Sequence, residues 1–244
     1  MIWAWLLVGA AGAGASLPLF TVGCGSDTES DSTGDAGSDA DSGSDGDGDG
    51  GEPPDEEIVT LHPDQPPLPG ETECKVVITT GIAVPNAMHV PLCTPVDYAT
   101  NPPSGGPHWP RWAAYTKYDV VVPREVYVHD MEHGAVVLAY RCEEPCPDVV
   151  DFLTTAFDEF PPDALCVTSG GTNRLVLTPD PELDAPVAAA AWGATYVATC
   201  LDRDSLDEFM EGRYGKGTES TCAQGVAVGS PDAGLDCDAG ADGG

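Results

Sequence analysis

The chain has 244 residues and a formal net charge of −32. All nine of its Lys and Arg residues lie between positions 58 and 224, so the segments on either side contain neither. Binding to nucleic acid phosphates requires a basic surface, which excludes nucleic acid as an expected partner. The length is that of one domain, or of two small ones.

The N-terminal residues 2–22 are apolar and uncharged, and Gly23-Cys24-Gly25 follows them. A short apolar run that ends in a small residue and a cysteine is typical of a lipoprotein signal peptide. We therefore predict a signal peptide over 1–24, with a lipid anchor on Cys24 that holds the protein outside the cytoplasm on a bacterial cell membrane. A plain secretory signal and a retained membrane helix are alternatives, since about 20 apolar residues can span a bilayer.

Acidic, low-complexity segments flank the remaining sequence. Residues 25–57 are almost entirely Asp, Glu, Ser, Thr, Gly and Pro, and low hydrophobicity with like-sign charge predicts a disordered acidic linker. Its Asp-Gly alternation at 45–50 lacks the distal Glu and the fixed spacing of a calcium loop. Residues 225–244, rich in Gly, Ala and Asp, predict a disordered acidic tail. One globular domain is left at 58–224, long enough for one core.

The first elements predicted within the domain are strands. Residues 75–80 form a short apolar run, and residues 125–129 alternate apolar and polar side chains. Residues 135–140 predict a more buried strand, which follows through a short turn ending in Gly134, as in a hairpin. The proline-rich segment 101–110 predicts a rigid loop, because proline fixes φ and removes backbone donors.

Helices and strands alternate in the second half of the domain. Apolar residues at helical spacing predict a helix over 148–160, and residues 174–177 predict a strand. A further strand is expected around 192–197, and Ser205-Leu206-Asp207-Glu208 has the pattern of a capping box that begins a helix. These elements predict an α+β fold, a single domain with a small mixed or antiparallel sheet covered by helices.

Nine cysteines are present. With Cys24 assigned to the lipid, eight remain, and an even number in an oxidising compartment predicts that disulfides stabilise the domain. Connectivity is not readable from spacing, although Cys222 and Cys237 are a candidate pair. Cys142 and Cys146 lie between a predicted strand and a predicted helix, where the helix N-terminus lowers a thiol pKa and favours thiolate metal binding or exchange. An ordinary local disulfide is the alternative that we favour.

Four of the five histidines lie in or near two short motifs. His108 is in the proline-rich loop, and His129 and His133 flank the predicted turn with Glu132 between them. Neutral imidazole is the commonest protein metal ligand, and carboxylates complete many sites. We predict that these side chains converge with His89 on one divalent or copper-type metal ion: zinc, copper, nickel or iron. The alternative is that the histidines only hydrogen-bond to loop backbone.

The same residues carry a resemblance to a known family. The motifs are Met88-His89-Val90, Asn101-Pro102-Pro103-Ser104-Gly105-Gly106-Pro107-His108-Trp109 and Val128-His129-Asp130-Met131-Glu132-His133-Gly134, with further matches at Tyr98, Ala191-Trp192-Gly193, Glu208-Phe209 and Glu219. In this order they resemble the domain-of-unknown-function 3105 family, bacterial extracytoplasmic proteins with PPTSGPH and HN-x-EHG signatures, over most of 85–220. The chain departs from that pattern by its second glycine, Gly106, and by Asp130 in place of Asn. The resemblance implies an extracytoplasmic location and supplies no activity.

The sequence contains no GxSxG, P-loop or HExxH motif. The functional hypothesis therefore rests on the histidines and predicts a membrane-anchored lipoprotein that binds a divalent metal. A metal-dependent hydrolase is the first alternative, because a metal held by His and Glu could activate water. A disulfide-stabilised interaction domain without metal is the second.

Overall fold

The computed structural model describes residues 55–84, 86–235 and 237. The predicted signal peptide, the lipid-anchor cysteine Cys24 and residues 25–54 of the predicted linker lie outside the described residues. Within the described part, no helix has both the length and the apolar character needed to cross a membrane.

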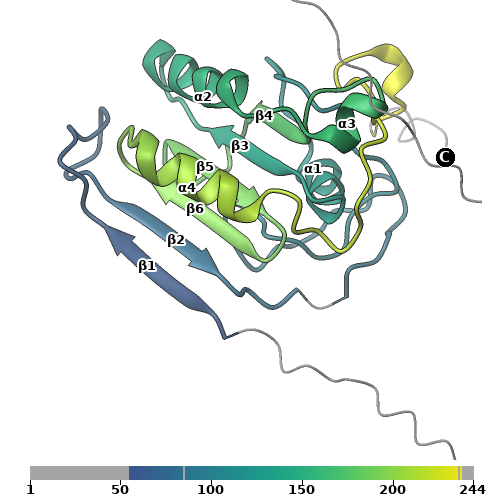
Figure 1. The fold of residues 1–244 in the computed structure, drawn as a ribbon, viewed down its shortest axis with the longest axis horizontal. Helices are drawn as coiled ribbons and strands as arrows, with labels where there is room; N and C mark the ends of the chain where they lie inside the picture. The colour runs from purple at the N-terminus through teal and green to yellow at the C-terminus, as the bar shows by residue number, and fades with distance from the viewer. Residues whose placement is uncertain (1–54, 85, 236, 238–244) are drawn as a thin grey trace, which may run out of the picture. The chain divides into compact units, whose positions relative to one another are not determined.

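A six-stranded sheet organises the domain (Figure 1). Its strands are β1 (Glu57–Leu61), β2 (Val76–Thr80), β3 (Val136–Tyr140), β4 (Leu175–Pro179), β5 (Val187–Ala191) and β6 (Ala194–Ala198). They lie in the order β1-β2-β6-β5-β3-β4, and neighbours pair antiparallel except for β3 and β4, which are parallel. A parallel pair requires a long crossover, and helices supply it here.

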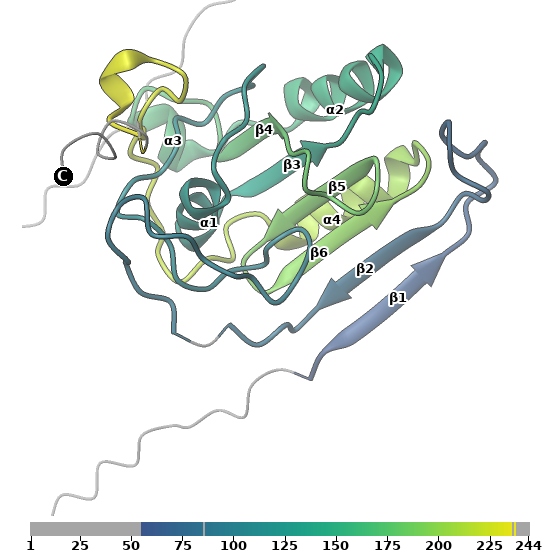
Figure 2. The same cartoon turned by 180° about the vertical axis from the view of Figure 1, so that it is seen from behind.

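Helices cover both faces of this sheet. They are α1 (Arg124–Glu132), α2 (Pro147–Glu159), α3 (Ala164–Thr168) and α4 (Arg203–Arg213), and a 3-10 turn η1 (Pro231–Ala233) follows near the C-terminus. Helices α2 and α4 pack on one face, while α1 and the long loop between β2 and α1 pack on the other, as the two opposite views show (Figures 1 and 2). The crossover from β3 to β4 runs through α2 and α3.

The core has two layers because successive side chains of a strand point to opposite faces. In β3, Val136 and Leu138 belong to the layer under α2 and α4, whereas Val137 packs in the layer that includes α1. All three are at most 1% exposed. A strand covered on both sides is a continuous apolar run instead of an alternating one.

The predicted fold class is confirmed, since the domain is α+β with one mixed sheet and helices over it. The strands expected at 75–80, 135–140 and 174–177 correspond to β2, β3 and β4, and the helix expected at 148–160 corresponds to α2. Around 192–197 the sequence predicted one strand. The structure has two there, β5 and β6, joined at Trp192-Gly193.

The strand predicted over 125–129 is wrong, because these residues form the middle of helix α1. Every side chain from Val126 to Met131 is buried, since the helix lies between the sheet and the long loop. A helix buried on all sides has no apolar stripe at helical spacing, so its chance alternation of Val126 and Val128 resembled a strand. The hairpin with β3 is therefore also absent, and His129 and His133 lie one helical turn apart.

Helix α4 begins before the predicted capping box. Its N-cap is Asp202, whose side chain accepts a hydrogen bond from the Ser205 backbone N–H at 3.1 Å. Ser205 is therefore inside the first turn of the helix, and its buried hydroxyl lies 3.2 Å from the hydroxyl of Tyr196. The helix was predicted, but its cap lies three residues further toward the N-terminus.

The packed domain extends beyond residue 224, its predicted end, into the segment predicted as a disordered tail. Val226 forms a β-bridge with Ala113, and Ala233 is only 4% exposed. Gly225 is required at this crossing, because a Cβ there would collide with the carbonyl oxygens of Trp112 and Ala113. Residues 225–235 thus pack against the loop before α1.

Four disulfides join the eight cysteines expected to pair. They are Cys74–Cys200, Cys93–Cys237, Cys142–Cys146 and Cys166–Cys222. The local disulfide favoured for Cys142 and Cys146 is present, whereas the suggested pairing of Cys222 with Cys237 is wrong. Three of the bonds join segments 56 to 144 residues apart in the sequence.

Candidate metal centre

The candidate site lies where the long loop before α1 crosses the last turn of that helix. His89 and His108 are partners in a parallel β-bridge: Val90 N–H donates to the His108 carbonyl at 2.8 Å, and His108 N–H donates to the Met88 carbonyl at 3.1 Å. The helix contributes His129 on the side that faces this bridge. Three segments, spaced about 20 residues apart in the sequence, thus bring three imidazoles together by backbone geometry.

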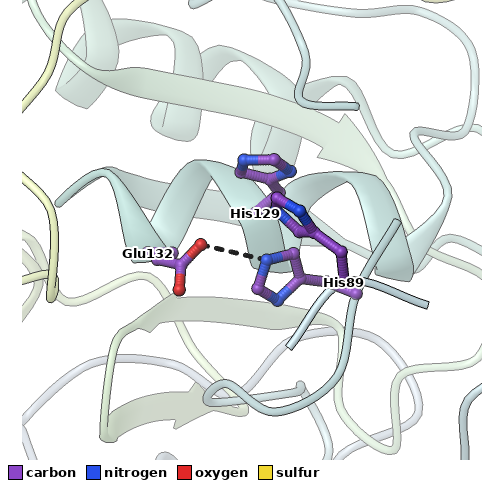
Figure 3. A group of neighbouring side chains, drawn as sticks. His89, His129 and Glu132 are labelled. Carbon is purple, nitrogen blue, oxygen red and sulfur yellow. Dashed lines mark ion pairs between the residues drawn. The ribbon is translucent and has the colours of Figure 1, made fainter. Parts of the chain in front are cut away.

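His89, His108 and His129 form a triangle of rings. Their centroids are 5.0 Å apart for His89 and His108, 4.8 Å for His89 and His129, and 4.7 Å for His108 and His129. Glu132 joins them, and one potential ligand atom from each of the four residues lies within 4.8 Å of the others. Figure 3 shows His89, His129 and Glu132 gathered from the crossing loop and the helix. We call His89, His108, His129 and Glu132 the His–Glu cluster.

Backbone carbonyls determine which imidazole nitrogens in the cluster are free. The Nδ1 atom of His108 lies 2.8 Å from the Gly106 carbonyl oxygen, and the Nδ1 atom of His129 lies 2.8 Å from the Trp109 carbonyl oxygen. A carbonyl can only accept, so Nδ1 must carry the proton in each ring. In a neutral ring the Nε2 atom then has a free lone pair. This arrangement is the one that usually orients metal-binding histidines.

Burial keeps the helix histidines neutral. The pKa of His129 is lowered to about 3, mainly by burial and also by the neighbouring histidines, against the opposing effect of the hydrogen bond to Trp109. Burial also lowers the pKa of His133, although Glu219 and Glu132 oppose the shift. Because only neutral imidazole can ligate a metal, both rings are in the ligand form at neutral pH.

The Glu132 carboxylate contacts His108 in a geometry that a proton or a metal cation would stabilise. Its Oε2 atom lies 3.0 Å from Nε2 of His108, the ion pair drawn as a dashed line in Figure 3. The His108 side chain is fully buried, and its Nε2 has no hydrogen-bond donor or acceptor partner with suitable geometry among the described residues. Since Nδ1 of His108 already donates to Gly106, two acceptors face each other unless a proton or a metal cation lies between them.

His133, the fifth predicted ligand, lies beside the cluster without joining it. Its Nε2 atom is 3.3 Å from Oε2 of Glu219, and its ring centroid is 4.7 Å from that of His129. The Trp112 ring contacts both, with centroids 5.1 Å from His129 and 4.9 Å from His133. The structure therefore gathers four of the five predicted residues and gives His133 a separate acidic partner.

Glu219 and Trp112 were not assigned to the site from the sequence. The loop after α4 places Glu219, because its N–H donates to the Glu132 carbonyl at 2.9 Å. Gly217 permits this approach, since a Cβ there would collide with backbone atoms of Met131, Glu132 and Gly134. The glycine-rich stretch at 212–217 was the available sign of a close backbone approach, but the sequence does not indicate which segment it approaches.

Asp130 lies within the buried part of α1 and holds the preceding loop against the helix. Burial raises the pKa of Asp130 well above its ordinary value, although the hydrogen bond from Ala113 N–H opposes this. That bond, 3.1 Å long, ties the loop carrying Trp112 to the helix. A protonated Asp has the shape of Asn, which fits the resemblance noted for this position.

Residues 89–225 match a family described as protein of unknown function, DUF3105. The chain belongs to this family. The matched segment starts at His89 and includes the whole His–Glu cluster together with His133 and Glu219, which confirms the resemblance inferred from the motifs. Neither the curated proteins nor the solved structures contain a match to the chain.

Proposed function

We propose that this protein is a membrane-anchored extracytoplasmic lipoprotein that binds one divalent metal ion through His89, His108, His129 and Glu132. One observation carries the proposal: four potential ligand atoms lie within 4.8 Å of one another. Carbonyl contacts to Nδ1 of two of these histidines leave their Nε2 atoms as the available ligands. A cation between Glu132 and His108 would also relieve the contact of two acceptors.

The ligand set favours a borderline transition metal. Three imidazoles and one carboxylate suit zinc and also suit copper, nickel or iron, whereas calcium and magnesium prefer oxygen ligands. His108 and His129 are buried, but His89 is exposed. A metal held by two rigid histidines and one solvent-facing histidine would be loaded and released through His89. This geometry supports a role in metal handling.

A metal-dependent hydrolase is a second candidate, favoured by the neighbouring pair His133 and Glu219. The Glu219 side chain is 59% exposed and lies beside a buried, neutral imidazole next to the cluster. If the ion kept one coordination position for water, an exposed carboxylate next to the cluster could act as a base toward that water. Absence of a water ligand in the absorption spectrum of a cobalt-substituted protein would eliminate this candidate.

The test is metal content after loading. Purified full-length protein is incubated with zinc, copper, nickel or iron, separated from free ion, and subjected to elemental analysis. Wild type should retain one ion per chain, and His129→Ala should retain almost none. His62→Ala is the matched control, because its side chain is 60% exposed and lies outside the cluster. A folded wild type that retains none of the four metals would refute the proposal.

A further inference from the structure

The Cys142–Cys146 disulfide differs from the other three in what it can contribute to stability. Its cysteines are 4 residues apart, whereas the other pairs are 126, 144 and 56 residues apart. A disulfide stabilises mainly by restricting the unfolded chain, and this restriction grows with the length of the closed loop. The bond between Cys142 and Cys146 closes the smallest loop, so stability is a poor explanation for it.

This disulfide is also accessible. The pairs Cys74–Cys200 and Cys166–Cys222 are buried, with every one of the four cysteines at most 8% exposed. Cys142 and Cys146 are half-buried, and both line a pocket of about 540 Å³. Exchange requires an incoming thiolate to reach one sulfur, and a pocket beside both cysteines offers space for that approach. Cys237 is exposed as well, but its bond to Cys93 closes a loop of 144 residues.

The two cysteines hold different positions relative to helix α2. Cys146 is the N-cap residue of α2, a helix of 13 residues, so its sulfur is near the positive end of the helix dipole. Asp148 in the first turn offsets part of this effect. Cys142 follows the end of β3 by two residues, precedes Glu143 in the sequence and is not part of α2. A thiolate is therefore better stabilised on Cys146, which makes it the better leaving group.

We propose that Cys142–Cys146 is a thiol–disulfide exchange site for a dithiol reductant whose cysteine-bearing segment is neutral or cationic. The pocket lining accounts both for the binding of a peptide segment and for the expected charge of that segment. Leu68, Val149 and Pro186 give it apolar walls that an extended peptide segment can contact. Its charged lining residues are four carboxylates and one guanidinium, so the pocket is acidic on balance: Glu71, Glu143, Glu144, Asp148 and Arg141. Carboxylates at the rim repel anionic thiols and attract cationic ones.

The exchange proceeds in two balanced steps. A thiolate of the dithiol attacks Sγ of Cys142, so that a mixed disulfide forms, the Cys142–Cys146 bond breaks, and Cys146 leaves as a thiolate that takes a proton from water. The second thiol of the reductant loses its proton and attacks its own sulfur in the mixed disulfide, which releases Cys142 to be protonated. Two electrons pass from the dithiol, now a disulfide, to the cysteine pair.

The first test follows each disulfide separately. The full-length protein is equilibrated with increasing ratios of reduced to oxidised dithiothreitol, free thiols are alkylated, and mass spectrometry measures reduction of each pair. Cys142–Cys146 should be half-reduced at a ratio at least about tenfold lower than any other pair, with the circular dichroism unchanged. Reduction at the same ratio as Cys74–Cys200, or loss of structure on reducing Cys142–Cys146 alone, would overturn the proposal.

The second test concerns the charge of the reductant. Cationic cysteamine should reduce Cys142–Cys146 faster than anionic mercaptoethanesulfonate, after each rate is divided by its rate with an uncharged model disulfide. The preference should shrink at high salt and in Glu143→Gln/Glu144→Gln. Glu208→Gln/Glu211→Gln removes two exposed charges from α4, outside this pocket, and should keep the preference. Equal rates for both thiols in wild type at low salt would contradict the assignment of a neutral or cationic segment.

Discussion

At the centre of the candidate site, the Glu132 carboxylate faces Nε2 of His108 at 3.0 Å. Without a proton or a metal cation between them, this is a contact between two acceptors in a place where His108 is fully shielded from water. With a cation, the same two atoms become ligands. One side chain therefore affects stability and metal affinity in opposite directions, and a single substitution can separate the two.

The variant Glu132→Gln tests this at the scale of one residue. Its amide N–H can donate to Nε2 of His108, so the metal-free protein should be at least as stable as wild type. Loss of the charged ligand should weaken zinc binding by about 10- to 100-fold. Chelator competition measures the affinity, and thermal unfolding with and without zinc measures the stability. Unchanged affinity would show that Glu132 is no ligand.

Asp163 gives a prediction for pH at the same scale. Burial opposes the shift, but hydrogen bonds from Leu165 N–H and the Tyr214 hydroxyl and the nearby Arg174 guanidinium lower the pKa of Asp163. A carboxyl with a lowered folded-state pKa adds stability above its unfolded pKa of about 4, and this stability is lost as pH falls through the folded-state value.

Asp163→Asn should therefore destabilise the protein at pH 7, and the difference from wild type should shrink as pH falls below about 4. Urea unfolding at a series of pH values measures it. Asp151→Asn, which changes an exposed carboxyl on α2, serves as the control and should show little difference at any pH. A gap between Asp163→Asn and wild type that stays constant down to the acid limit would contradict the assignment.

At the scale of elements, the loop after α4 packs against the end of α1. Gly215 N–H donates to the Gly134 carbonyl at 2.8 Å, and Glu219 N–H donates to the Glu132 carbonyl at 2.9 Å. The contact is close because Gly217 has no Cβ. This loop therefore brings Glu219 to His133 and supports the helical turn that carries Glu132.

Gly217→Ala should destabilise the domain by about 1–3 kcal/mol, because the new Cβ must displace the loop from backbone atoms that cannot move independently. The displacement should also weaken metal binding through Glu132. Gly212→Ala is the matched control: it lies in α4 with open space around its Cβ, and Ala should stabilise the helix by about 0.5–1 kcal/mol. Equal stabilities for the two variants in urea unfolding would contradict the close approach.

At the scale of the whole molecule, the expected lipid anchor decides where the His–Glu cluster works. Cys24→Ala should abolish labelling by radioactive palmitate and release the protein from the membrane fraction of an expressing bacterium. Labelling followed by fractionation measures both. A wild type without label points to a plain secretory signal or a retained helix, and a Cys24→Ala protein that stays in the membrane points to the helix.

Local sequence patterns were sufficient to predict those helices and strands whose apolar residues follow a simple run or period. Helix α2 follows from apolar residues at helical spacing, because it is buried against one face of the sheet, and strands β2 and β3 follow from short apolar runs. The histidine motifs were sufficient for most of the candidate site. His108 lies in the proline-rich loop and His129 in the HDMEH segment, and backbone carbonyls of the proline-rich loop orient both side chains.

Tertiary structure decided what depends on several segments at once. Helix α1 is covered on both sides, so its sequence has no apolar stripe of the kind that marks a helix. The sequence therefore predicted a strand and a turn around His129 and His133, where the structure has a helix and its C-cap. The disulfide partners and the approach of Glu219 to His133 depend on how distant segments pack. Local spacing carries no information about such contacts, because their geometry is set by the packing of the folded domain.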